Sequence, residues 1–139
     1  NEDHFMPSVA INLNEVIEKP RLPASTPFTF SFSNAEFGLA KKPNKNTGKQ
    51  EPLIKCILLP LEPDYNHRTV YHTFSLSPGA LSADSSVISI KKFFSTVGYK
   101  WSDDGSFSTE DLMTVRFMGE VEYKEGSNFP SLSKVITGA

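Results

Sequence analysis

Residues 28–33 alternate strictly between an aromatic ring and a small hydroxyl side chain. Phe28, Phe30 and Phe32 occupy every second position, with threonine or serine between them. Successive side chains of a β-strand point to opposite faces of the sheet, so this period of two predicts a strand with one buried face. The three rings could also stack on nucleic-acid bases, but no polar residue shares their face. We therefore interpret them as core side chains.

Four other segments have the apolar patterns and flanking turn residues that are typical of strands. The five predicted strands span residues 28–33, 53–61, 68–76, 112–124 and 132–136. In the third strand, one apolar face would bury His72, and we expect the hydrogen bonds of its ring to be satisfied there. Tyr71 is then left as an aromatic residue on the polar face of the same strand.

One segment has the period of a helix instead. Apolar residues recur there at positions i, i+3, i+4 and i+7, namely Ile90, Phe93, Phe94 and Val97. This spacing predicts an amphipathic helix over residues 90–97. Ser85 or Ser86 could cap the start of the helix, and Gly98 suits the position after its last turn, where a left-handed backbone is common.

The predicted order of elements is therefore three strands, one helix and two strands. This order favours an all-β fold with one helix, specifically an OB-fold, which is a five-stranded Greek-key barrel with the helix between strands 3 and 4. Other small β folds with one helix fit the same order. We predict a single OB-fold domain over residues 1–139, in which residues 1–27, punctuated by four prolines, form an N-terminal arm.

The charged residues are segregated along the chain. The net charge is only −2, unlike the strongly basic domains that are typical of nucleic-acid binding. Residues 41–55, however, hold five lysines against one glutamate, a net charge of +4, whereas residues 101–125 carry a net charge of −5. Such a distribution can keep one groove basic while the whole protein stays near neutral.

No pattern typical of an enzyme or a metal site is present. Cys56 is the only cysteine and lies in an apolar run, so we expect a buried thiol and neither an intramolecular disulfide nor a cysteine-based zinc site. The three histidines lack ligand spacing, and no phosphate-binding glycine loop or nucleophile elbow occurs. The acidic pairs at 103–104 and 110–111 are interpreted as solvated loop charges. We predict no catalytic residue, metal, cofactor, membrane span or signal peptide, which is consistent with an intracellular protein.

Four segments together resemble a known family. They are "INLNEVIEKPRLPASTPFTFSFSNAEF", "KKPNKNTGKQEPLIKCILLPLE", "VISIKKFFSTVGYKW" and "FMGEVEYKEGSNFPSLSKVI". In order and spacing, over about residues 9–136, they resemble phage-encoded single-stranded DNA-binding proteins and their phage relatives. The resemblance implies an OB-fold that binds and protects single-stranded DNA without sequence preference during phage DNA replication and recombination. It also implies the cytoplasm of the infected bacterial host as location, and phage or host replication proteins as further partners.

Single-strand binding requires cations that follow the phosphates and aromatic rings on which bases stack. In OB-folds the ligand lies on strands 2 and 3, between the loop joining strands 1 and 2 and the loop joining strands 4 and 5. This mapping selects Lys41, Lys42, Lys45 and Lys49 on the first loop, Lys55 on strand 2, Arg68 and Tyr71 on strand 3, Lys124 at the last loop, and Tyr65 and Trp101 as further stacking candidates.

Several of these residues have a purely structural alternative. Trp101 could close one end of the barrel, Tyr65 could cover its turn, and Lys55 shares its predicted strand face with apolar residues. The alternative function is a non-enzymatic structural or protein-interaction β-barrel module of a phage. The N-terminal arm could pack on a neighbouring subunit, which leaves a homodimer open.

Overall fold

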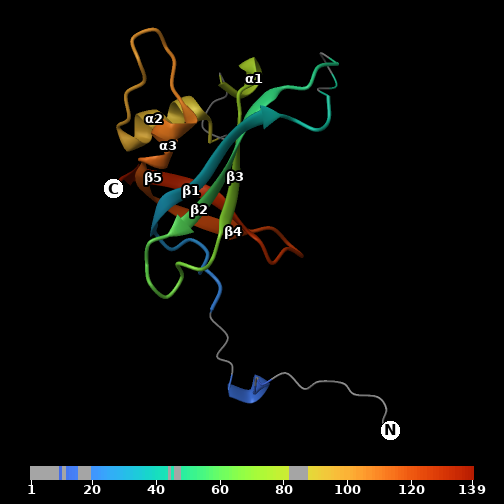
Figure 1. Ribbon diagram of the computed structural model, residues 1–139, viewed down its shortest axis with the longest axis vertical. Helices are drawn as coiled ribbons and strands as arrows, with labels where there is room; N and C mark the ends of the chain where they lie inside the picture. The colour runs from blue at the N-terminus through green and yellow to red at the C-terminus, as the bar shows by residue number, and fades with distance from the viewer. Residues whose placement is uncertain (1–9, 11, 16–19, 44, 46–47, 82–87) are drawn as a thin grey trace.

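The chain forms a five-stranded antiparallel sheet with a few short helices (Figure 1). The computed structural model describes residues 10, 12–15, 20–43, 45, 48–81 and 88–139. The strands are β1 (Phe28–Leu39), β2 (Pro52–Pro60), β3 (Val70–Ser75), β4 (Arg116–Tyr123) and β5 (Pro130–Gly138). The helices are η1, a 3-10 turn (Leu13–Glu15), α1 (Pro78–Leu81), α2 (Ile90–Val97) and α3 (Thr109–Met113). The prediction of an all-β fold is confirmed.

The strands lie in the order β3-β2-β1-β4-β5, so that the first strand is central. β1 pairs with β2 over most of its length, but with β4 only through residues 28–31. Cα atoms of β3 and β5, the two edge strands, approach within 8 Å of each other. The sheet therefore curls until its edges face each other, and it encloses a core.

Aromatic rings fill this core, as the alternation in residues 28–33 predicts. The Phe30 ring stacks on Phe117 at a centroid distance of 5.5 Å, and Phe93 of α2 meets Phe117 edge-on at 5.0 Å. Phe28, Phe30 and Phe32 are all buried. Their interpretation as core residues is confirmed, because none of the three rings is accessible to a base.

Helix α2 covers one end of the barrel with its apolar side, and it occupies the predicted residues. Its N-cap is Ser89, whose Oγ accepts a hydrogen bond of 3.2 Å from the backbone N–H of Lys92. The expected cap at residue 85 or 86 was wrong, because the helix begins at Ile90; those two residues lie outside the described part of the chain. Gly98 adopts φ 78° after the last turn and donates its N–H to the Phe94 carbonyl, as predicted.

The predicted strand 112–124 is in fact a short helix followed by a strand. Ser108 and Asp111 form a capping box, in which each side chain accepts a hydrogen bond from the other residue's backbone N–H. Helix α3 begins at this box, and its Leu112 side chain is buried in the core. The strand therefore begins only at Arg116. The interpretation of Asp111 as a solvated loop charge was therefore wrong: its carboxylate caps α3 and also accepts a 2.6 Å hydrogen bond from Tyr99 Oη.

A β-bulge divides β1 into two parts. The register with β2 shifts between Phe32 and Asn34, leaving Ser33 as the extra residue. Without the bulge, the alternation of residues 28–32 would direct Asn34 and Glu36 into the barrel. With it, these two polar side chains lie on the outer face, and the strand continues six residues beyond the predicted end at residue 33.

The segment before β1 is attached to the barrel near the start of β3 and the end of β4. Leu22 is buried, its carbonyl accepts a 2.8 Å hydrogen bond from Tyr123 Oη, and Ser25 N–H donates to the Val121 carbonyl at 3.0 Å. Helix η1 stands apart from the barrel (Figure 1). Residues 20–27 are therefore held against the barrel, and their side chains can contribute to a site at this end of it.

Candidate functional site

The outer surface of β1, β2 and β3 is a small grid of paired residues, here called the strand face. One row across the strands is Asn34–Ile57–Tyr71, and the next is Glu36–Lys55–Thr73. A shallow pocket of about 240 Å³ opens on these two rows. Four of the six side chains are polar, and one is an exposed aromatic ring.

Tyr71 is the aromatic residue of the strand face. Its side chain is 64% exposed, while its neighbours Val70 and His72 point inward. The sequence placed Tyr71 on the polar face of its strand, and this placement is confirmed. An exposed ring on a rigid strand is a suitable platform for stacking a base.

Lys55 points outward beside Tyr71, because the inner positions of β2 are taken by Ile54, Cys56 and Leu58. Glu36 lies directly opposite Lys55 on β1, where opposite charges on neighbouring strands attract. The carboxylate offsets the charge of Lys55. The strand face thus has less net positive charge than the lysine alone would give it.

Four further lysine candidates lie in the β1–β2 loop, residues 40–51. Lys41, Lys42, Lys45 and Lys49 are all exposed. The loop is closed at its base by a 2.8 Å hydrogen bond from Ala40 N–H to the Glu51 carbonyl. Because β1 runs from Glu36 directly into this loop, the four lysines lie at one end of the strand face.

A second basic group lies where β3 begins. Arg68 Nε donates a 3.1 Å hydrogen bond to the Pro20 carbonyl, and the Arg21 guanidinium lies 4.2 Å from the centroid of the Tyr123 ring. They line a pocket of about 300 Å³, called the arginine pocket, with Leu22, His67, Thr69, Tyr123, Asn128, Phe129 and Pro130. Lys124 is exposed at the start of the adjoining β4–β5 turn.

The sequence analysis missed two members of the arginine pocket. Phe129 is 75% exposed at the end of the β4–β5 turn, directly before β5, and Arg21 belongs to the N-terminal segment. Phe129 could have been identified from the sequence, because a phenylalanine in a turn rich in glycine and asparagine is expected to be exposed. Arg21 gave no such signal, since only the packing of Leu22 brings it to the barrel.

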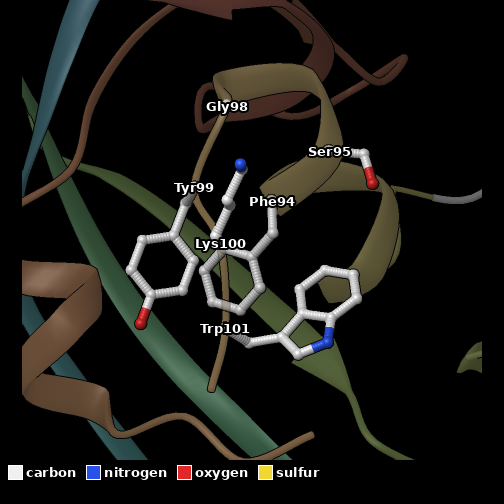
Figure 2. Close-up of a pocket in the computed structure, with 6 residues that line it drawn as sticks. All are labelled: Phe94, Ser95, Gly98, Tyr99, Lys100 and Trp101. Carbon is white, nitrogen blue, oxygen red and sulfur yellow. The ribbon is translucent and has the colours of Figure 1, made fainter. Parts of the chain in front are cut away.

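Two predicted stacking candidates lie away from the strand face. Tyr65 is half-buried and meets the Phe28 ring edge-on at 5.2 Å. Trp101 follows α2 and packs on Phe94 at 6.3 Å, and Figure 2 shows the Phe94 ring between those of Tyr99 and Trp101. Both rings therefore pack against core aromatic residues. This agrees with the structural alternatives for Tyr65 and Trp101 given in the sequence analysis.

Two groups capable of proton or thiol chemistry are kept neutral by burial. Burial lowers the pKa of His72 to about 4, although a hydrogen bond with the Ile88 backbone acts in the opposite direction. Its Nε2 atom is buried without a hydrogen-bond partner, so the expectation of a satisfied ring holds only for the nitrogen that bonds to the Ile88 backbone. Burial also raises the pKa of Cys56 to about 12. At neutral pH, His72 is therefore uncharged and Cys56 is a thiol.

Within the described ranges, no group of three or more histidine, cysteine or acidic residues could hold a metal ion. None of the helices in those ranges has the length and apolar character needed to cross a membrane. No protein-family model, curated protein or solved structure matches the chain significantly. Function must therefore be inferred from the strand face and its two basic ends.

Proposed function

We propose that this protein is an OB-fold that binds single-stranded DNA without sequence preference and protects it during phage DNA replication and recombination. The strand order β3-β2-β1-β4-β5, with β3 close to β5 and α2 between β3 and β4, supports a Greek-key barrel of this type. The family resemblance of the sequence supports the phage context and the cytoplasm of the infected host. This function requires no catalytic residues.

The observation that carries the proposal is the position of Tyr71. Its exposed ring lies on the outer face of the third strand, between the lysines of the β1–β2 loop and the arginine pocket. In the view of Figure 1, the β1–β2 loop and the β4–β5 turn both extend to the right of β3. A single strand laid along β3 would meet cations, then an aromatic ring, then cations again.

Each part of this path has a separate task. The exposed lysines of the loop attract phosphates, a base stacks on Tyr71, and a second base can stack on Phe129 beside Arg21. Glu36 disfavours a phosphate next to Lys55, which favours bases rather than backbone on the strand face. Stacking accepts any base, and this accounts for binding without sequence preference.

A fluorescence-anisotropy titration with labelled oligo(dT) and with a duplex of equal length tests the proposal. We expect the single strand to bind more tightly, with a log–log salt slope of about −0.7 for each neutralised phosphate. Equal affinity for both ligands, or no binding to either, would overturn the proposal. Retention of a phage or host protein without any DNA binding would favour the alternative, a protein-interaction β-barrel module.

A further inference from the structure

The last residues of β1 form an edge of the sheet. β4 pairs with β1 only through residues 28–31, so beyond the bulge β1 is paired with β2 on one side alone. In Figure 1 this end of β1 lies away from β4 and leads into the β1–β2 loop. Helix α3, which leads into β4, also lies close to β1. A strand edge presents backbone groups that can pair with another chain.

The register with β2 determines which backbone groups point outward at this edge. In an antiparallel pair, the N–H and C=O of alternate residues point to the partner strand. Ala40 N–H donates to the Glu51 carbonyl of the neighbouring strand end. Gly38 therefore also faces β2, whereas the backbone groups of Phe37 and Leu39 point away from it. Within the part of the chain that the structure describes, no hydrogen bond reaches the N–H or C=O of these two residues.

The side chains at this edge are apolar and exposed as well. Phe37 is 61% exposed and Leu39 is 54% exposed, on the side of the sheet opposite the strand face. Between them, Gly38 has open space where a Cβ atom would lie. Residues 37–39 contain neither a charge nor a proline, the two devices that commonly protect an edge strand from pairing. We therefore expect another strand to cover this edge.

A second copy of the same edge is complementary to it. When two such edges pair antiparallel about a twofold axis at Gly38, Phe37 of each copy lies opposite Leu39 of the other. The outward backbone groups of each opposed pair can then exchange both hydrogen bonds. The two exposed apolar side chains cover each other on one face, and the two glycines meet without steric conflict on the other face.

Charge favours this register over its neighbours. With the axis at Gly38, Glu36 of one copy lies beside the start of the other copy's β1–β2 loop, where Lys41 and Lys42 are exposed. Opposite charges on neighbouring strands attract. An axis at Glu36 would instead place two carboxylates directly opposite each other, and an axis at Phe37 would move Glu36 away from the lysines.

We propose that two copies of this protein associate through the ends of their β1 strands, in an antiparallel pair centred on Gly38. The contact is isologous, so it closes at two copies and does not build longer chains. It joins two sheets into one and places both strand faces on the same side. The contact is small, so the dimer should be weak and depend on concentration. The proposal does not depend on DNA binding, because the pairing is made by the strand edge.

Sedimentation velocity of the full chain over a range of concentrations, without DNA, tests the proposal. The average mass of the wild type should increase with concentration towards that of a dimer and not beyond. Phe37→Lys and Leu39→Lys should remain monomers, because each places two cations in the contact. Leu61→Lys is the matched control, since Leu61 is also exposed (40%) but lies in the β2–β3 loop. It should associate as the wild type does.

A cross-link tests the register itself. With the axis at Gly38, the two Gly38 residues form a pair without mutual hydrogen bonds, whose Cα atoms lie about 4.5 Å apart. This separation suits a disulfide, so Gly38→Cys should yield a covalent dimer under mild oxidation, which a reducing agent reverses. Ala40→Cys is the control, because the two Ala40 Cα atoms would lie about 14 Å apart. The native Cys56 is buried and should not contribute.

Three outcomes would overturn the proposal. One is a wild type that stays monomeric at every concentration, together with a Gly38→Cys protein that forms no more covalent dimer than Ala40→Cys does. Another is a wild type that associates while the folded Phe37→Lys and Leu39→Lys proteins associate equally well, with folding judged by circular dichroism. The third is a mass that rises beyond that of a dimer, which an isologous contact does not allow.

Discussion

Acid should destabilise this protein through one buried imidazole, that of His72. The ring lies on the inner face of β3, edge-on to Phe74 at a centroid distance of 4.5 Å, and its Nε2 atom has no hydrogen-bond partner. Burial lowers its pKa from 6.5 to about 4. An unfolded chain therefore takes up a proton near pH 6.5, whereas the folded chain takes it up only near pH 4.

The sign and size of the effect follow from this difference. Stability is complete above pH 6.5 and is lost as the pH falls towards 4, because protons then bind preferentially to the unfolded state. At about 1.4 kcal/mol per pKa unit, the loss is about 2 kcal/mol at pH 5 and about 3 kcal/mol at pH 4. Further acidification adds little from this residue.

Urea unfolding at pH 7.5, 6.5, 5.5 and 4.5, monitored by circular dichroism, measures the effect. Carboxylates also titrate towards the acid end of this range, so the comparison is with His72→Leu, which has a similar volume and no titratable group. The wild type should lose about 2.5 kcal/mol more than the variant between pH 7.5 and 4.5. Parallel pH dependences in the two proteins would refute the assignment of the acid sensitivity to His72.

Three further predictions concern the strand face, the core thiol and α2. Tyr71→Ala should weaken oligo(dT) binding roughly 5- to 150-fold without changing the melting temperature, because one stacking contact is lost; Tyr71→Phe, which keeps the ring, should bind nearly as the wild type does, and equal affinities for all three proteins would contradict the role of the ring. Cys56 should not react with a thiol reagent at pH 8 in the folded protein but should react fully in urea, since its pKa is about 12; rapid labelling of the native state would show that the thiol is accessible. Ser89→Ala should lower the free energy of unfolding by about 1 kcal/mol through loss of the α2 N-cap, measured by urea denaturation with Ser95→Ala, an exposed position of the same helix, as a control that should change it little.

The sequence predicts those features that depend on neighbouring residues. The burial of Phe28, Phe30 and Phe32 and the exposure of Tyr71 each follow from a local period of two. The helix at 90–97 follows from a period near 3.6, and the end of that helix from one glycine. These patterns act over one strand or one turn, so a single chain is enough to find them.

The features that the sequence did not predict depend on contacts between distant residues. The bulge at Ser33 is defined only by the register with β2. The arginine pocket requires Leu22 to pack in the core, which brings Arg21 and Arg68 together from positions 47 residues apart in the sequence. Helix α3 was detectable in principle, since the spacing of Ser108 and Asp111 is that of a capping box, but the apolar alternation that follows it favoured a longer strand.

The bulge at Ser33 has a consequence for how this protein could diversify. Before it, β1 supplies phenylalanines to the core; after it, the polar positions 34 and 36 belong to the outer surface. One continuous strand thus has a first half that contributes phenylalanines to the core and a second half that places polar side chains on the outer face, separated by a single extra residue. Substitutions at 34 and 36 can change the charge and shape of the strand face while the interior stays intact. Deletion of Ser33 would remove the bulge and make Phe32 and Asn34 consecutive positions of one regular alternation, so Asn34 and Glu36 would stay on the outer face.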